Sequence, residues 1–126
     1  MKNLIKDIRR DFNAPNLPFV IVAMGQNGSN PAAGAMLTIR EAQMAMNDVP
    51  EFKGNVKAFR SDLLVDKDAE RLMTQKDPVL RERDKDEVKK FAADEAYHYY
   101  GSPIWYMRIG HAMGEAMLEL LKNQGN

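Results

Sequence analysis

The sequence contains no cysteine, only two histidines and one tryptophan, and no net charge at neutral pH. Without cysteine there is no disulfide, no thiolate nucleophile and no thiolate-bound metal. Balanced acidic and basic residues create no strong field to attract a nucleic-acid backbone or an anionic membrane surface. The chain also lacks a long apolar run, and its charged N-terminus does not read as a secretion signal. We therefore expect no nucleic-acid or membrane partner, while the localisation stays open.

The length of 126 residues fits one domain. It falls short of the roughly 200 residues that an open, doubly covered sheet of five parallel strands usually takes. With two histidines and no clustered ligand spacing, we expect no metal site, and nothing in the sequence indicates a cofactor. His111 lines up with Arg108, Glu115 and Glu119 at helical spacing, so it should face water.

The N-terminal half predicts a strand, a helix and a second strand. Phe19–Met24 is an unbroken apolar run, typical of a parallel strand covered on both faces. A loop at residues 25–31 and a helix at 32–47 lead to a short strand at 55–60. Such a unit forms a right-handed crossover with parallel strands, so the predicted fold class is α/β. An amphipathic helix precedes it, predicted from the spacing of Leu4, Ile5, Ile8 and Phe12.

Two segments complete the pattern. From about residue 66 to 90, charges of both signs dominate, which is typical of a solvated helical excursion or a mobile loop. A last helix is predicted over about 103–122, with Ser102 as its cap and Pro103 at its first position. The core-facing stripe of this helix is predicted to contain Ile109, Ala112, Met113, Ala116, Met117, Leu120 and Leu121.

Four phrases occur in order along the chain. They are Ala14-Pro15-Asn16-Leu17-Pro18-Phe19-Val20-Ile21, Arg40-Glu41-Ala42-Gln43, Val49-Pro50-Glu51-Phe52-Lys53-Gly54-Asn55-Val56 and Tyr97-His98-Tyr99-x-Gly101-Ser102. Their order and spacing resemble the C-terminal half of the SGNH-type carbohydrate esterases, the sialate O-acetylesterase-like and acetylxylan-esterase-like proteins. The resemblance implies a partial flavodoxin-like fold of three layers, with a short parallel sheet and covering helices. It also implies hydrolysis of carbohydrate O-acetyl esters by a serine and a histidine through an acyl-enzyme.

The residue that this resemblance marks as the catalytic base is His98. An imidazole can accept and return a proton near neutral pH, and a neighbouring carboxylate can fix its tautomer and stabilise the imidazolium. Glu95 stands where the family often has aspartate, and Asp94 lies one residue earlier. The orienting acid is therefore open between these two carboxylates, and a backbone carbonyl could replace both.

By the same resemblance, the substrate is an acetylated carbohydrate. We expect Gln26 and Asn27 in the first loop, and Tyr97 and Tyr99 beside His98, to bind it. Tyrosine rings and Trp105 could stack on sugar faces, although packing under the last helix explains the aromatic residues equally well.

The serine nucleophile of the family lies in an earlier block, and no such block precedes Phe19. Ser29 follows a strand and precedes a helix, but the inserted Asn27-Gly28 breaks the spacing of a nucleophile elbow. We expect the Ser29 loop to wall the site or cap the next helix instead. The chain should then be inactive alone, and the open edge of its sheet should favour self-association or a complementing N-terminal half.

Two other classes of function remain open from the sequence. One is a non-catalytic carbohydrate-binding or accessory module, and the other is a structural α/β domain whose resemblance is only architectural. Sugar binding without ester turnover would favour the first, and a silent His98→Ala substitution would favour the second.

Overall fold

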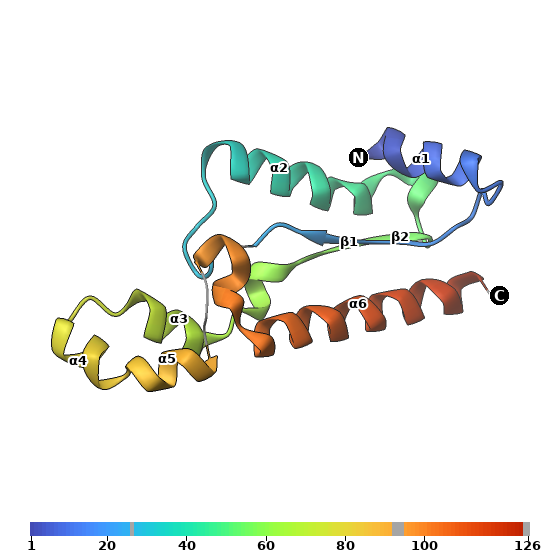
Figure 1. The fold of residues 1–126 in the computed structure, drawn as a ribbon. Helices are drawn as coiled ribbons and strands as arrows, with labels where there is room; N and C mark the ends of the chain where they lie inside the picture. Colours follow the sequence, from blue (N-terminus) through green and yellow to red (C-terminus); the bar gives the residue numbers. More distant parts are fainter. Residues whose placement is uncertain (26, 92–94, 125–126) are drawn as a thin grey trace.

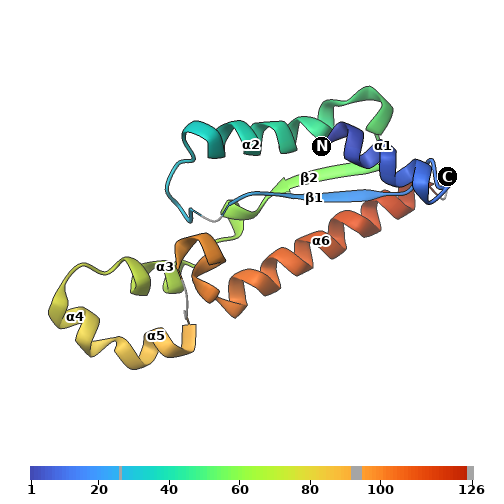
Figure 2. The same ribbon diagram turned by 45° about the horizontal axis from the view of Figure 1, so that its top comes forward.

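A computed structural model describes residues 1–25, 27–91 and 95–124. Its elements, with η for 3₁₀ helices, are α1 (Lys2–Asp11), β1 (Phe19–Ala23), α2 (Gly34–Met44), η1 (Ala45–Asp48), η2 (Pro50–Phe52), β2 (Val56–Arg60), η3 (Ser61–Leu64), α3 (Lys67–Thr74), α4 (Pro78–Arg83), α5 (Lys85–Phe91), η4 (Ala96–Gly101) and α6 (Pro103–Gln124). The two strands form a central layer, with α1 and α2 on one face and α6 on the other (Figures 1 and 2). The predicted arrangement of a short parallel sheet with covering helices is confirmed at this level.

The two strands pair in parallel, with Phe19 opposite Val56 and Ala23 opposite Arg60. At the start of the pair, the Phe19 amide donates to the Asn55 carbonyl at 3.0 Å. Parallel strands require a crossover connection, which α2 and the short helices after it provide. Valine, isoleucine and phenylalanine fit this pleated layer because their side chains pack well between covering helices.

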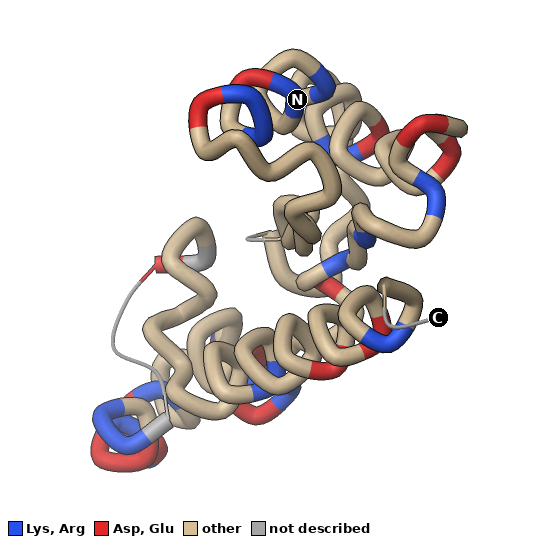
Figure 3. Tube along the Cα trace, turned by 90° about the vertical axis from the view of Figure 1, so that its right-hand side faces the viewer, with Lys and Arg blue, Asp and Glu red and all other residues tan. Residues whose placement is uncertain are grey.

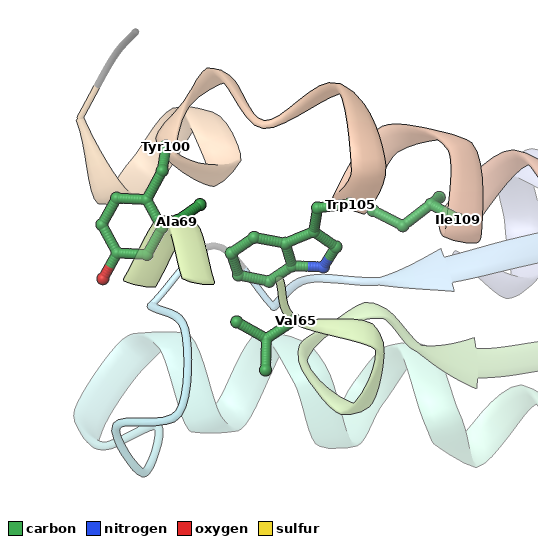
Figure 4. Packing of buried hydrophobic residues seen from close by; sticks show 5 residues of the cluster. All are labelled: Val65, Ala69, Tyr100, Trp105 and Ile109. Carbon is green, nitrogen blue, oxygen red and sulfur yellow. The ribbon is translucent and has the colours of Figure 1, made fainter. Parts of the chain in front are cut away.

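Alternate strand residues serve two separate hydrophobic clusters. Towards α1, Ile21 and Val56 pack with Ile5 and Phe52. Towards α6, the strand residues Val22 and Phe59 pack against the second cluster. Its buried members are Val65, Ala69, Tyr100, Trp105 and Ile109 (Figure 4). This alternation is the two-residue period of a strand whose two faces are both covered.

Helix α1 uses its predicted apolar stripe only in part. Ile5 is buried, but Leu4 is 54% and Phe12 is 75% exposed, so the prediction that both face the core was wrong. Arg9 is buried instead, and its guanidinium donates to the Leu17 carbonyl at 2.7 Å and to the Asn55 side chain at 2.8 Å. These bonds tie the end of α1 to the starts of both strands, because Leu17 precedes β1 and Asn55 precedes β2.

The Arg40-Glu41-Ala42-Gln43 phrase on α2 has a structural role at the end of β1. Arg40 Nε donates to the Met24 carbonyl at 2.9 Å, and the Met24 amide donates to Gln43 Oε1 at 2.9 Å. Two side chains one helical turn apart therefore satisfy both backbone groups of Met24, where the pairing of β1 with β2 has just ended.

The charged segment at 66–90 is helical, as one of the two predicted alternatives stated. It forms α3, α4 and α5, which extend beyond the sheet (Figure 1) and carry intermixed charges of both signs (Figure 3). Asp66 and Asp77 cap α3 and α4 by accepting from backbone amides of the first turns. In the part of the chain that the structure describes, no helix combines the length and apolar character needed to cross a membrane.

Helix α6 buries only one part of its apolar surface. Trp105, Ile109, Ala116 and Leu120 are buried, whereas Met113 is 41% and Leu121 is 48% exposed. The predicted core-facing stripe was therefore too wide. The physical reason is that a sheet of two strands is too narrow to cover the whole apolar side of this helix.

Candidate functional site

The His98 segment lies beyond the C-terminal ends of the two parallel strands (Figure 1). Ser61, which directly follows β2, connects this segment to the strand ends. Its hydroxyl donates to the carbonyl of Ala23 at the end of β1, at 2.9 Å. The same hydroxyl lies 3.3 Å from the Tyr99 hydroxyl, and the Trp105 indole donates to the Ser61 carbonyl at 2.9 Å. In α/β sheets this is the end at which ligands are bound.

His98 is exposed to solvent, and its ring meets the Tyr97 ring edge-on with 4.5 Å between centroids. Its backbone is held on both sides, since its amide donates to the Glu95 carbonyl at 2.9 Å and its carbonyl accepts from the Tyr106 hydroxyl at 3.1 Å. Asp94 lies outside the described residues. The choice of orienting acid between Glu95 and Asp94 therefore stays a prediction.

A left-handed run of backbone follows His98 directly. Tyr99 and Tyr100 both have φ of 55° and Gly101 has φ of 64°. A side chain in this region costs about 1–2 kcal/mol per residue, so two tyrosines here must be compensated by their surroundings. Tyr100 is buried, and the Tyr99 ring packs edge-on against Trp105 with 4.9 Å between centroids. Backbone strain is thus concentrated next to the candidate base.

Trp105 packs against the core side of this loop (Figure 4). Its side chain is fully buried with 0% exposure, so the idea that it stacks on a sugar was wrong. The indole fills the space between the sheet and η4, and its N–H bond to Ser61 fixes the direction of the ring. Tyr99 is half-buried against Trp105 and Tyr106, which makes it a support of the loop.

Ser102 caps α6 as predicted, and it also connects α6 to α3. Its hydroxyl accepts from the Trp105 amide at 3.1 Å and donates to Asp66 at 2.5 Å. Asp66 uses its other oxygen to accept from the Asp68 and Ala69 amides at the start of α3. Both side chains are buried, so one pair of residues joins two helix starts directly behind the His98 loop.

The loop after β1 packs against the same region. Gly28 has φ of 61°, and a Cβ there would lie 2.4 Å from Glu70 Oε1 and 3.3 Å from the Tyr100 hydroxyl. Asn27 is half-buried in this loop, and Gln26 lies outside the described residues. A direct contact of Asn27 or Gln26 with substrate therefore stays a prediction.

Ser29 is held by a neighbouring carboxylate. Its amide donates to Glu70 Oε1 at 2.6 Å, its hydroxyl donates to Glu70 Oε2 at 2.5 Å, and the hydroxyl also accepts from Lys67. Partial burial would raise the pKa of Glu70, but the bonds from Ser29 and Lys67 outweigh it and lower this pKa below its ordinary value. The predicted capping of the next helix by this loop was wrong, because α2 has Ala33 at its N-cap and no side-chain cap, while Ser29 bonds to α3 instead. The alternative, that the loop walls the site, stays a prediction.

Sequence reasoning missed a second polar cluster at the strand ends. Arg40 Nη1 lies 3.1 Å from Asp62, both side chains being nearly buried, and Arg60 also pairs with Asp62 at 2.5 Å. Burial would raise the pKa of Asp62, but the two guanidinium groups lower it overall. The sequence did carry one sign of this cluster, since Ser61 and Asp62 directly follow a predicted parallel strand, the place where polar site residues often lie.

His111 lies away from this site. It is exposed, as predicted, and it borders a groove between β2 and α6 whose other walls include Lys57, Glu115 and Glu119. Among the described residues, no group of three or more acidic or histidine side chains could hold a metal ion.

Comparisons with protein-family models, with curated proteins and with solved structures gave no match to this chain.

Proposed function

We propose that this chain supplies the general-base histidine of a carbohydrate O-acetyl ester hydrolase with a partial flavodoxin-like, SGNH-type fold. The carrying observation is the exposed imidazole of His98, on a loop fixed at the C-terminal end of a parallel sheet. The resemblance in sequence order supports the same role. Because no nucleophile block is evident, we propose that the serine comes from another polypeptide segment and that this chain is inactive alone.

The chemistry asked of His98 is proton transfer. The serine hydroxyl attacks the acetyl carbonyl while the imidazole takes its proton, and the imidazolium returns that proton to the departing sugar oxygen. Water then attacks the acyl-enzyme with the imidazole again as base, which releases acetate. For this role the imidazole ring must keep one orientation, which requires that the backbone of the His98 loop be held in place. The buried side chains of Trp105, Ser61 and Ser102 support this backbone.

The same residues favour a second candidate function, carbohydrate binding without turnover. Tyr97 is 62% and Tyr106 is 50% exposed; the Tyr97 ring contacts the His98 ring, and the Tyr106 hydroxyl donates to the His98 carbonyl. Exposed tyrosines can stack on the apolar face of a sugar. Loss of sugar binding in Tyr97→Ala, with no ester turnover under any condition, would favour this candidate over the esterase.

A complementation assay tests the esterase proposal. The chain is mixed with a separately expressed nucleophile-bearing N-terminal segment of an SGNH-type esterase, and acetate release from an aryl acetate and from acetylated xylan is measured. We expect His98→Ala to lower this release by about 10²–10⁴-fold, the usual contribution of a general base. His111→Ala is the matched control, because it removes the only other imidazole and should leave the rate unchanged. Full release with His98→Ala would overturn the proposal.

A further inference from the structure

Tyr106 reaches the His98 segment from the first turn of α6. Its hydroxyl donates to the backbone carbonyl of His98 at 3.1 Å, and its own amide donates to the Ser102 carbonyl at 3.2 Å. Ser102 caps this helix and also bonds to the buried Asp66, so the start of α6 is held from behind. The Tyr106 hydroxyl therefore extends from an anchored part of the fold to the loop of the candidate base.

The accepting carbonyl belongs to the peptide unit that joins His98 to Tyr99. His98 has φ of −103° and ψ of 28°, and Tyr99 has φ of 55°. Rotation of this peptide unit by half a turn would change ψ of His98 and φ of Tyr99 together, and would return Tyr99 to a negative φ with less strain. The carbonyl would then point away from Tyr106. The hydrogen bond from Tyr106 thus opposes a rotation that backbone strain favours.

The ring of Tyr106 is held independently of its hydroxyl. It meets the Tyr99 ring edge-on with 5.6 Å between centroids, and the Tyr99 ring in turn packs on Trp105. Because Tyr106 is half-exposed, water can reach the His98 carbonyl when the hydroxyl is removed. Tyr106→Phe should therefore keep the aromatic packing, lose the one bond and leave the stability of the fold nearly unchanged.

We propose that Tyr106 is a positioning residue for His98. Its bond to the His98 carbonyl keeps the loop in one backbone conformation and so gives the imidazole one direction. The catalytic part of this inference rests on the proposed function, because the direction of the ring affects turnover only if His98 transfers a proton. Tyr106 acts through His98 and need not touch the substrate.

NMR of the full chain tests the direction of His98. The chain has a mass of 14.3 kDa, and His111→Ala leaves His98 as its single imidazole. The three-bond couplings between Hα and Hβ of His98 should report one side-chain rotamer, and an average over rotamers once Tyr106→Phe is added. Thr38→Val is the matched control, because it removes another exposed hydroxyl that donates to a backbone carbonyl, that of Gly34 at 3.2 Å, and should leave the couplings unchanged.

Kinetics in the complementation assay test the consequence for turnover. Tyr106→Phe should lower kcat by about 2–10-fold, which corresponds to the loss of one neutral hydrogen bond, and leave KM unchanged. In the His98→Ala background the same substitution should cause no further loss, because Tyr106 acts through His98. Urea denaturation should give nearly equal free energies of unfolding for Tyr106→Phe and Thr38→Val.

Unchanged His98 couplings in Tyr106→Phe would overturn the positioning role. So would an unchanged kcat, or an equal loss of kcat with and without His98. A large loss of stability in Tyr106→Phe would overturn it as well, since the bond would then support the whole fold rather than the direction of one ring. If no variant releases acetate, the esterase proposal fails by itself, and the couplings still decide whether Tyr106 directs His98.

Discussion

Replacement of Ser102 by alanine tests how the loop before α6 is held. The substitution removes the helix cap from the Trp105 amide and the hydrogen bond to the buried carboxylate of Asp66. Loss of a cap costs about 1 kcal/mol, and loss of a hydrogen bond to a charged group costs about 1.5–3 kcal/mol. Because both groups are buried, water cannot replace the hydroxyl. We expect Ser102→Ala to lower the free energy of unfolding by about 2–4 kcal/mol.

Urea denaturation followed by circular dichroism measures this loss. Ser29→Ala is the matched control, since it deletes the same hydroxyl at an exposed site, where water can take over part of its bonding to Glu70 and Lys67 and the cost should be smaller. Hydrogen exchange should also show faster exchange of the Ser102 amide, which donates to the Tyr99 carbonyl in the loop. A cost for Ser102→Ala no larger than that for Ser29→Ala would refute the reasoning.

Three further predictions concern the strand ends and edges. Gly25→Ala should cost about 1–3 kcal/mol or more in a urea melt, because its Cβ would lie 2.1 Å from the Asp62 amide nitrogen; a neutral result would contradict this packing. The pKa of Glu70 is lowered from its ordinary value of 4.5, so the ionised carboxylate stabilises the fold at pH values above 4.5, and this contribution is lost as the pH falls through the lowered pKa. Glu70→Gln should therefore flatten the acid side of the stability–pH curve. An unchanged slope would argue against the Ser29 contacts. Asn47→Ala should cost about 1–3 kcal/mol in a urea melt, because it leaves the Ala58 amide and carbonyl at the edge of β2 without their side-chain partner, and a neutral result would show that these two bonds do not support the strand.

The order of elements could be predicted from the sequence because each carries its own local signal. Phe19–Ala23 is an apolar run between proline and glycine, and α6 begins at the predicted Ser102 cap. These features depend on neighbouring residues along the chain, so no knowledge of distant contacts is needed.

Which apolar residues are buried could not be predicted in the same way. The hydrophobic period of α1 and α6 is real, yet Phe12 and Leu121 are exposed because the sheet beneath the helices has only two strands. Helical spacing identifies an apolar side of a helix but not the width of the surface that covers it.

The candidate site shows the same division. The role of His98 rests on the family resemblance and stays a prediction, whereas Ser102 could be located from the sequence because a helix cap has a local pattern. The buried cluster of Arg40, Ser61 and Asp62 could not, since it forms only when the ends of two strands and a helix converge. Trp105 was ambiguous between sugar stacking and core packing, and only its burial decides the matter.

The most direct test of the central claim uses the fact that the chain has only two histidines. NMR spectra of the two imidazoles, assigned with His98→Ala and His111→Ala, are recorded while an acetylated xylooligosaccharide is added. The account predicts that the His98 signals shift and the His111 signals do not, and that the deacetylated sugar has a weaker effect. Shifts confined to His111, or equal shifts of both rings, would contradict the claim that His98 faces the substrate.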